Sequence, residues 1–351
     1  MRILKYLIFL FLILAIGLSI YVAIQPDEYK IVKTRVVYAP KAVIYEYINN
    51  IKSWEKWSVW YDQDPNMKVT YGENFKGDGA SASWDSEVHG KGTITSDFNS
   101  IDSLSYIADI TEPKDAKAHR FFTLDSTVDE NEVIITSGIE GNLSFKDKFF
   151  ILFQHSMENK FGSDFENSLA KLDSVVIADM KTYSITPVGK TEYGGGYYLY
   201  ETTSAKQNEI DLAAKRMFPE IEAFMEQNLI QSSGNRFTLF EQWDESNNSA
   251  IFSTAIPVKE RIITPAGSSI LCGFIDPGIY YKTVLKGDTV NINEAWSKAR
   301  EAIKKDGLEI DNSRKPFETY IVTKEDSANP ADFVSEIYIP IVTNTEDLLV
   351  N

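Results

Sequence analysis

The chain contains very little cysteine and histidine, and this shortage excludes two common ways of holding a protein together. Its 351 residues include one cysteine, Cys272, so no disulfide can form within the chain. The three histidines, His89, His119 and His155, lack the spacing of a zinc site. We therefore expect folded regions stabilised by apolar cores alone, with no structural metal and no cofactor.

Basic residues are also scarce, because 35 lysines and arginines face 51 acidic residues and the net charge is -16 at pH 7. Such a chain repels the phosphate backbone, so we do not expect nucleic acid as a partner. Long uncharged runs are scarce too: only one occurs, at the N-terminus, and the remainder is long enough for two ordinary domains. The composition therefore indicates a tethered globular protein rather than a channel.

The one long apolar run covers residues 6–24, and as a helix it is long enough to cross a bilayer core of about 30 Å. A secretory signal peptide is the alternative reading. Its apolar region is normally shorter and ends at small residues, whereas here Tyr21 and Val22 precede Ala23. We therefore predict a membrane anchor within residues 1–27.

Charges on either side of this run predict its orientation. Arg2 and Lys5 precede it, while Asp27 and Glu28 follow it. The positive-inside rule then keeps the N-terminus in the cytoplasm and sends everything after Gln25 across the membrane. The hypothesis is a single-pass protein of the cell inner membrane whose C-terminal domains are periplasmic.

The first folded region, residues 28–177, begins with an extended segment and continues with a helix whose apolar residues recur from Val43 to Ile51. It ends in an amphipathic pattern over residues 157–176 that predicts one long helix. Between them, short alternating runs separated by turn residues predict an antiparallel meander wrapped around that helix, with a cavity between the two. The strands are expected at residues 67–71, 80–89, 92–97, 104–110, 120–128 and 132–139.

Spaced alanine, proline, glycine and tryptophan residues in this region resemble a pattern of the START-like, polyketide-cyclase type (SRPBCC) superfamily. The resemblance covers the whole region. It implies a helix-grip fold that usually binds hydrophobic small molecules or lipids, and it does not imply one reaction. The residues that carry it are Ala39, Pro40, Val43, Ile48, Asn50, Trp54, Trp57, Gly77, Gly79, Ala80, Trp84, Gly90 and Gly92.

Two groups of side chains in this region are candidates for a site. Trp54, Trp57 and Trp84 are predicted to line a ligand cavity, although aromatic residues at this spacing also form cores. The second group consists of three polar residues that alternate along a predicted strand, so they would share one face of it. They could serve acid-base or metal chemistry, and the alternative is that they form a solvated outer face. That group is Asp85, Glu87 and His89.

The second folded region, residues 178–351, contains an internal repeat. The first copy consists of GYYLYETTSA, a helix pattern ending EAFMEQNL, and the segments NRFTLFEQW and IFSTAIPV. The second copy repeats this order with GIYYKTVLKG, a helix pattern ending EAIKKDGL, and the segments KPFETYIVT and VSEIYIPI. The repeat predicts two βαββ halves, which would pair into one sheet with the helices behind and an open groove in front. Pro219 predicts a kink or break near Phe218. The matched pairs are Gly196 and Gly278, Glu222 and Glu301, Leu229 and Leu308, Phe237 and Phe317, and Pro257 and Pro340.

One ionisable residue stands out in the stretch RKPFETYIVT, residues 314–323. Period two places Glu318, Tyr320 and Val322 on one mostly apolar strand face. A carboxylate there must be hydrogen-bonded, paired or neutral, and such perturbed carboxylates bind cations or move protons. The alternative is that Glu318 lies on a half-exposed face or meets a nearby lysine or arginine.

The repeat, with Glu318, Tyr320, Ile337 and Pro340 near its end, resembles the gyrase-inhibitor-like domain, the effector-binding domain of bacterial transcription activators. In that family a glutamate on this strand lies in an aromatic-lined groove between the halves. It contacts cationic lipophilic ligands or, in hydrolytic members, helps to open strained rings. The resemblance implies this role for Glu318, whose counterpart in the other half is Thr238. Its candidate aromatic neighbours are Tyr320, Phe240, Trp243, Tyr280 and Tyr281, whereas Trp296 is expected to pack its helix onto the sheet.

Together these features predict an α+β protein with an N-terminal transmembrane helix, a helix-grip (START-like) domain and a duplicated βαββ (gyrase-inhibitor-like) domain. Such domains often follow a DNA-binding motif, which neither the preceding region nor the negative charge supports here. Two functions remain: a membrane-anchored protein that binds lipophilic or cationic small molecules, or a hydrolase or isomerase with Glu318 as general acid or base beside Tyr320. We favour binding and name no catalytic residue, because no nucleophile, metal or oxyanion motif accompanies Glu318.

Overall fold

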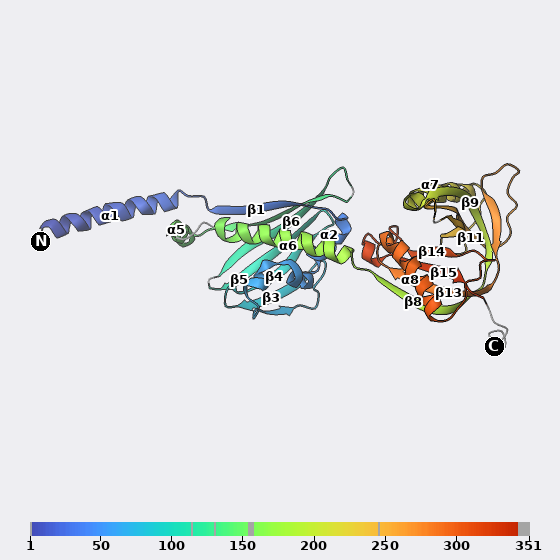
Figure 1. Cartoon of the computed structure of the whole chain (residues 1–351). Helices are drawn as coiled ribbons and strands as arrows, with labels where there is room; N and C mark the ends of the chain where they lie inside the picture. The colour runs from blue at the N-terminus through green and yellow to red at the C-terminus, as the bar shows by residue number, and fades with distance from the viewer. Residues whose placement is uncertain (1, 114, 130, 154–157, 245, 343–351) are drawn as a thin grey trace. The chain divides into compact units, whose positions relative to one another are not determined.

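The computed structural model describes residues 2–113, 115–129, 131–153, 158–244 and 246–342. It has mixed α+β structure with two antiparallel sheets (Figure 1). The chain divides into two compact units, Met1–Asp179 and Met180–Asn351, each built around one of the sheets. Each unit is described by itself below.

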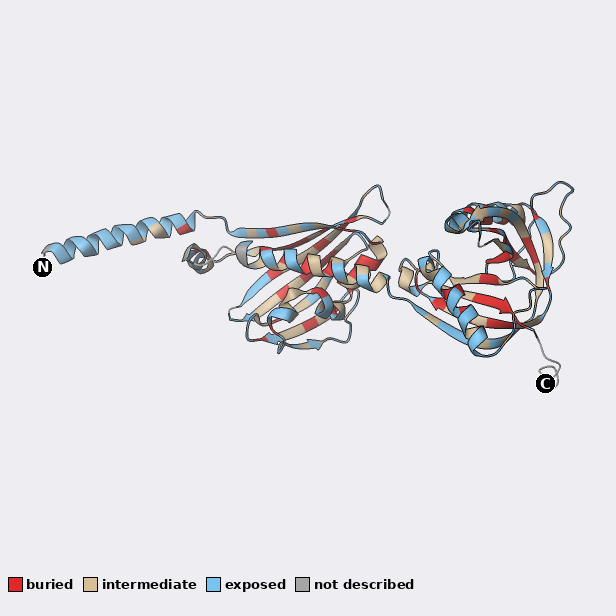
Figure 2. Ribbon diagram, viewed as in Figure 1, coloured by how far each residue is buried: buried red, intermediate tan, exposed pale blue. Residues whose placement is uncertain are grey.

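The first helix, α1 (Arg2–Ala23), is apolar on every side, and nearly all of its side chains are exposed (Figure 2). Its segment Ile3–Ala23 is long and apolar enough to cross a membrane, a test that a signal sequence also passes. Just beyond it, Asp27 forms an ion pair with Lys148 of α5 (Phe145–Phe153). Because an exposed helix of this kind is poorly solvated by water, it needs an apolar environment.

The first unit contains a seven-stranded antiparallel sheet in the order β1-β7-β6-β5-β4-β3-β2. The predicted antiparallel meander is therefore confirmed, and the pairing of the first strand with the last adds one contact between distant segments. The strands are β1 (Glu28–Val37), β2 (Lys68–Tyr71), β3 (Ser81–Ser86), β4 (Gly90–Asn99), β5 (Ser103–Glu112), β6 (Ala116–Ser126) and β7 (Val133–Asn142).

Helix α6 (Ser163–Met180) follows a π-helical turn, Glu158–Gly162, and packs against this sheet. Its buried residues Phe165, Leu169 and Leu172 are those of the predicted amphipathic stripe, whereas Met157 lies outside the described residues. Four short helices lie between the first two strands. They are α2 (Lys41–Asn49), η1 (Ile51–Ser53), α3 (Trp54–Trp57) and α4 (Val59–Gln63).

The second unit contains one eight-stranded sheet in the order β12-β9-β11-β10-β14-β15-β13-β8. The two repeat segments meet at the β10–β14 pair, so the order is symmetrical about that pair. Each edge strand comes from outside the segment that it extends, because β8 pairs with β13 and β12 pairs with β9. The strands are β8 (Ser184–Tyr193), β9 (Gly196–Lys206), β10 (Phe237–Asp244), β11 (Ser249–Val258), β12 (Leu271–Ile275), β13 (Gly278–Lys286), β14 (Phe317–Val322) and β15 (Val334–Pro340).

Two helices, α7 (Ile210–Gln227) and α8 (Ile292–Lys305), pack on one face of this sheet within a single apolar cluster. Helix α7 lies on β9 and β11, while α8 lies on β8, β13 and β15. Helix α7 runs through Pro219 without ending, so the break near Phe218 is wrong, while the alternative of a kink stays a prediction. The buried side chains of Met217 and Phe218 hold this part of α7 against the sheet, which offsets the hydrogen bond that proline cannot donate.

Candidate functional site

Glu318 lies on β14 with its side chain toward α7 and α8. Adjacent strand residues point to opposite faces, and Phe317 accordingly packs on the other side of the sheet with Tyr280 and Tyr338. Glu318 is 6% exposed. The half-exposed alternative is therefore wrong, and the carboxylate lies in the apolar layer between sheet and helices.

Neutral donors hold both carboxylate oxygens of Glu318. The Trp296 indole Nε1 on α8 donates to Oε2 at 2.8 Å, and the Tyr320 hydroxyl donates to Oε1 at 2.8 Å. The Tyr320 Oη also lies 2.8 Å from the hydroxyl of Thr238, on the neighbouring strand β10. In the part of the chain that the structure describes, no basic side chain pairs with Glu318, so its charge has no counter-ion within the fold.

Burial raises the pKa of Glu318, and the hydrogen bonds from Trp296 and Tyr320 oppose part of that increase. Burial, with the neighbouring Glu318 carboxylate, also raises the pKa of Tyr320 well above its usual value, so this phenol remains a proton donor. The two hydrogen bonds therefore stabilise the ionised carboxylate by less than burial destabilises it. A cation brought by a ligand would supply the missing stabilisation.

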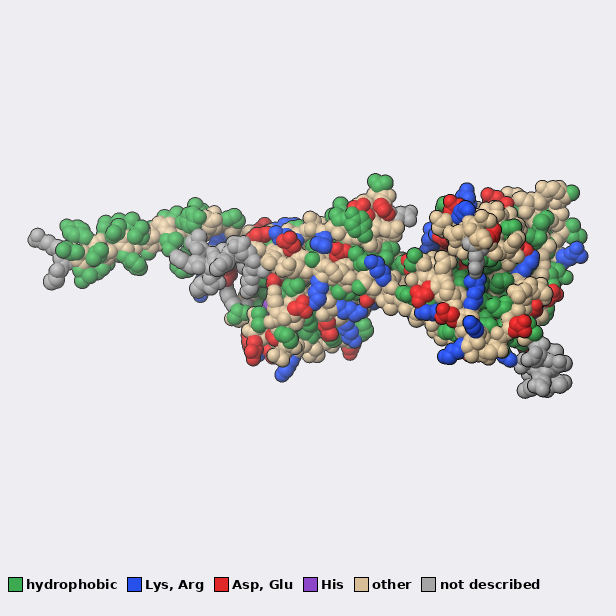
Figure 3. Space-filling view, viewed as in Figure 1, with side chains coloured by type: hydrophobic (Ala, Val, Ile, Leu, Met, Phe, Trp, Pro, Cys, Tyr) green, Lys and Arg blue, Asp and Glu red, His purple; other side chains and the backbone are tan. Residues whose placement is uncertain are grey.

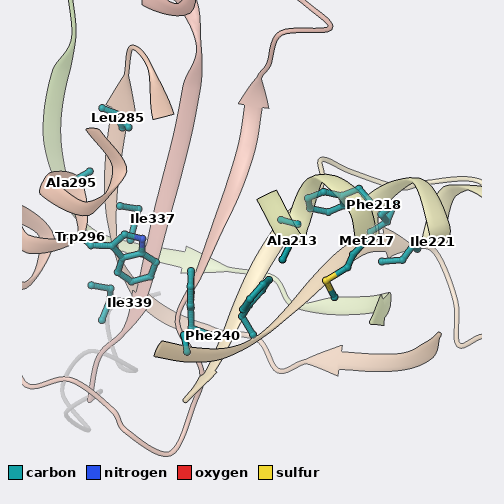
Figure 4. Packing of buried hydrophobic residues seen from close by; sticks show 14 of the residues in the cluster. Ala213, Met217, Phe218, Ile221, Phe240, Leu285, Ala295, Trp296, Ile337 and Ile339 are labelled. Carbon is teal, nitrogen blue, oxygen red and sulfur yellow. The ribbon is translucent and has the colours of Figure 1, made fainter. Parts of the chain in front are cut away.

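Aromatic rings surround this carboxylate from both helices and from β10. The ring of Phe240 meets Trp296 edge-on at 5.1 Å and Trp243 at 5.5 Å. In Figure 4, Phe240 lies between Trp296 on one side and the α7 side chains on the other. Phe218 of α7 meets the Tyr320 ring at 6.0 Å and a right angle. The sequence predicts Phe218 only as part of a helix pattern. Its contact with Tyr320 could not be predicted, because that contact depends on where α7 lies over the sheet.

The two predicted tyrosines of β13 lie on opposite faces of the sheet. Tyr281 belongs to the cluster beneath α8 and donates to Asp306 at 2.8 Å. Tyr280 lies on the face away from the helices, 5.5 Å from the Phe317 ring. The expected grouping of Tyr280 with the Glu318 neighbours is therefore corrected, since strand alternation separates the two residues.

The face of the sheet that carries Tyr280 contains an open pocket of about 610 Å³. Its acid, Glu336, lies 2.7 Å from the Lys282 ammonium and accepts a hydrogen bond from Tyr338 at 2.7 Å. That carboxylate is already paired, and the lining also includes Lys259, so this pocket presents aromatic surface without an uncompensated carboxylate. An open groove in front of the sheet was expected, but Glu318 does not face it. The aromatic lining residues are Tyr193, Tyr197, Tyr198, Phe237, Phe274, Phe317 and Tyr338.

The tryptophans of the first unit lie in two separate clusters. Trp54 and Trp57 pack against Phe122 at 6.0 and 6.1 Å, and their indoles donate to backbone carbonyls. Trp84 instead meets Trp60 at 6.2 Å. Trp57 is 2% exposed, which matches the core alternative, whereas Trp54 is only partly buried; the role of both residues in ligand binding stays a prediction.

The three polar residues Asp85, Glu87 and His89 do not share a strand face. Strand β3 ends at Ser86, and Glu87 and His89 lie in the turn that follows. The His89 ring stacks on Trp60 at 4.5 Å. The acid-base or metal constellation read from strand alternation is therefore wrong. Across the described residues, no three histidine, cysteine or acidic side chains are grouped to hold a metal ion.

No protein-family model and no curated protein matches the chain. Among solved structures, it is similar to the EcmrR C-terminal domain, with 15% identity over 46% of this chain and 99% of that one, and a TM-score of 0.38. The structure of SAV2435 bound to tetraphenylphosphonium matches with 10% identity over 48% of this chain and 98% of that one, and a TM-score of 0.35. The hypothetical protein jhp0584 from Helicobacter pylori matches with 13% identity over 43% of this chain and 89% of that one, and a TM-score of 0.34.

Proposed function

We propose that this chain is a membrane-anchored protein whose second unit binds lipophilic cations at Glu318. The observation that carries the proposal is a buried carboxylate held by the neutral donors Trp296 and Tyr320, without a basic partner among the described residues. A ligand cation would provide the counter-ion, and the surrounding rings would each add about 0.5 to 2 kcal/mol of cation–π attraction.

Entry to the site would lie between the two helices. Helix α7 packs on β9 and β11, and α8 packs on β8, β13 and β15, so the central pair β10–β14 lies between them. Glu318 and Thr238 are direct partners on that pair. Because Glu318 is almost fully covered, a ligand must displace side chains such as Phe240 to reach it, and it would bury much of its own apolar surface in doing so.

The proposed organisation is an anchor at residues 1–27, a START-like domain at residues 28–177 and a gyrase-inhibitor-like domain at residues 178–351. The division of the structure between Asp179 and Met180 supports the second boundary. The symmetrical strand order of the second unit supports a duplicated βαββ layout, and the meander with α6 supports a helix-grip arrangement for the first. Both family assignments rest on the sequence motifs.

Saturable binding of tetraphenylphosphonium by the full chain in lipid nanodiscs is the direct test. We expect calorimetry to show a saturable site that neutral triphenylphosphine oxide does not fill with similar affinity, since only the cation gains the Glu318 carboxylate. Empty nanodiscs correct for partitioning into lipid. Heat no larger than that of empty discs would reject the proposed function.

The proposed topology, with residues 6–24 spanning the inner membrane and both units in the periplasm, has its own test. Arg2 and Lys5 precede the span, and positive residues flanking a span stay cytoplasmic. An alkaline phosphatase fused after Asn351 should therefore be active in cells, and a fluorescent protein that matures only in the cytoplasm should stay dark there. The opposite pair of results would reverse the topology.

Catalysis by Glu318 is the second candidate function, because burial raises the pKa of this carboxyl and Tyr320 stands beside it as a proton donor. Its hydrogen-bond partners are an indole and a phenol, which position the carboxylate but supply no nucleophile of ordinary reactivity. An enzyme would show turnover that follows the ionisation of Glu318. A binding protein would show only affinity.

A further inference from the structure

Four polar residues form a continuous row across the sheet beneath α7 and α8. Glu201 on β9 is the direct partner of Thr254 on β11, and Thr254 is the partner of Thr238 on β10. Thr238 is in turn the partner of Glu318. Direct partners on adjacent strands project to the same face, so all four side chains lie on the Glu318 side of the sheet.

Two members of this row have buried polar atoms without a hydrogen-bond partner. Thr254 is fully buried and its Oγ1 has no partner, and the Oε2 atom of Glu201 is also buried without one. The Oγ1 of Thr283, a fully buried residue further along the same face, is in the same state. Leaving such an atom unpaired destabilises the fold, and folded proteins seldom do so. Two such atoms on adjacent strands indicate a place where a ligand supplies the missing contacts.

Glu201 is a second carboxylate without a counter-ion. Burial, together with Glu220 of α7, raises the pKa of Glu201, and no ion pair involves it among the described residues. When the repeats are aligned at Gly196 and Gly278, Glu201 corresponds to Thr283, as Glu318 corresponds to Thr238. At these two matched positions, therefore, each half has one carboxylate and one threonine, in exchanged order.

We propose that the row from Glu201 to Glu318 binds an elongated ligand with two cationic groups, one at each carboxylate. Three strand spacings of about 4.8 Å separate the two glutamates, so their backbones are roughly 14 Å apart. That distance is too long for one ion to touch both, because metal–oxygen contacts are about 2.0 to 2.6 Å. The hydroxyl groups of Thr254 and Thr238 lie between the two ends and contact the middle of the ligand. This inference rests on the proposed function, since Glu318 belongs to both sites.

The test uses decamethonium, two quaternary ammonium groups joined by a decamethylene chain, and its single-headed analogue decyltrimethylammonium. Both are titrated into the full chain in nanodiscs, with empty discs as the blank. We expect Glu201→Gln to weaken decamethonium binding by about tenfold, which corresponds to about 1.4 kcal/mol, and to leave decyltrimethylammonium affinity unchanged. Glu318→Gln should weaken both ligands, because each places an ammonium group there.

Glu241→Gln is the matched control. Glu241 is also a strand glutamate of this sheet, but it contacts Ser253 and Lys315 rather than the row. Its replacement should leave both affinities unchanged. If Glu201→Gln fails to fold as judged by circular dichroism, the unaltered chain still provides a test, because hexamethonium is too short to reach both carboxylates and should bind at least tenfold more weakly than decamethonium.

The outcomes separate this inference from the proposed function. Equal loss of both ligands in Glu201→Gln, or equal binding of hexamethonium and decamethonium, would overturn the two-cation site while Glu318-dependent binding of decyltrimethylammonium remained. Absence of any saturable decyltrimethylammonium binding would overturn the proposed function as well.

Discussion

Glu318→Gln is expected to weaken tetraphenylphosphonium binding by tenfold or more, equivalent to at least about 1.4 kcal/mol. Glutamine has nearly the same shape. Its amide oxygen can accept from the Trp296 indole, and its amide nitrogen can donate to the Tyr320 hydroxyl, which then donates to Thr238, so the principal change is the loss of charge. Calorimetry of both forms in nanodiscs measures the difference. Triphenylphosphine oxide should lose much less affinity, because it has no charge to pair.

Equal losses for the cation and the neutral ligand would assign Glu318 a structural role and end the charge-recognition hypothesis. Glu241→Gln serves again as the control, since it removes one negative charge from the same sheet at a carboxylate that is already paired with Lys315. Its effect on tetraphenylphosphonium should be below about twofold, within the range of long-range charge effects in salt.

Glu318→Gln should also change how the stability of the protein depends on pH. Folding raises the pKa of Glu318 above its usual value of 4.5, so the folded state prefers the protonated form. The resulting stabilisation is fully present below about pH 4.5 and is lost as the pH rises through the folded-state pKa. Thermal melts over a pH series should therefore show Glu318→Gln gaining stability relative to the unaltered chain as the pH rises. An unchanged difference across the series would contradict the assigned direction of the shift.

Periodicity was sufficient for the elements whose contacts are local. The apolar run of α1, the meander of the first unit and the stripe of α8 all depend on side-chain repeats of fixed period. The edge strands β8 and β12 were not predicted as part of the second sheet, because their partners β13 and β9 belong to the other half of the unit. Pairing across such distances leaves little trace in a local pattern.

The candidate site shows the same division between local and distant information. Strand alternation was enough to place Glu318 and Tyr320 on one face, whereas Tyr280 and Tyr281 are adjacent aromatics and only the true register decides which one joins them. Glu201 was not predicted at all, because its link to Glu318 passes through the registers of four strands. Trp296 was expected to pack, and packing alone did not predict its hydrogen bond.

Trp296→Ala is expected to cause a large loss of stability in the second unit, about 3 to 5 kcal/mol. The indole is 7% exposed, packs edge-on against Phe240 and donates to Glu318, so its removal creates a cavity and also leaves a carboxylate oxygen without a donor. Hydrogen exchange of the α8 amides measures this unit separately from the first. Trp243→Ala is the control, since Trp243 meets the same Phe240 ring but is only partly buried, and it should cost clearly less.

Trp296→Phe separates the hydrogen bond from the packing, because phenylalanine keeps an aromatic ring but has no N–H. In the unaltered chain this substitution leaves the Glu318 Oε2 atom buried without its donor, which costs about 1 to 3 kcal/mol beyond the loss of ring volume. In a Glu318→Leu background there is no carboxylate to satisfy, so the same substitution should cost less by that amount. A double-mutant cycle measured by α8 hydrogen exchange gives the coupling directly. A coupling near zero would mean that Trp296 acts through packing alone, and Glu318 would then be held in place by Tyr320 and its strand.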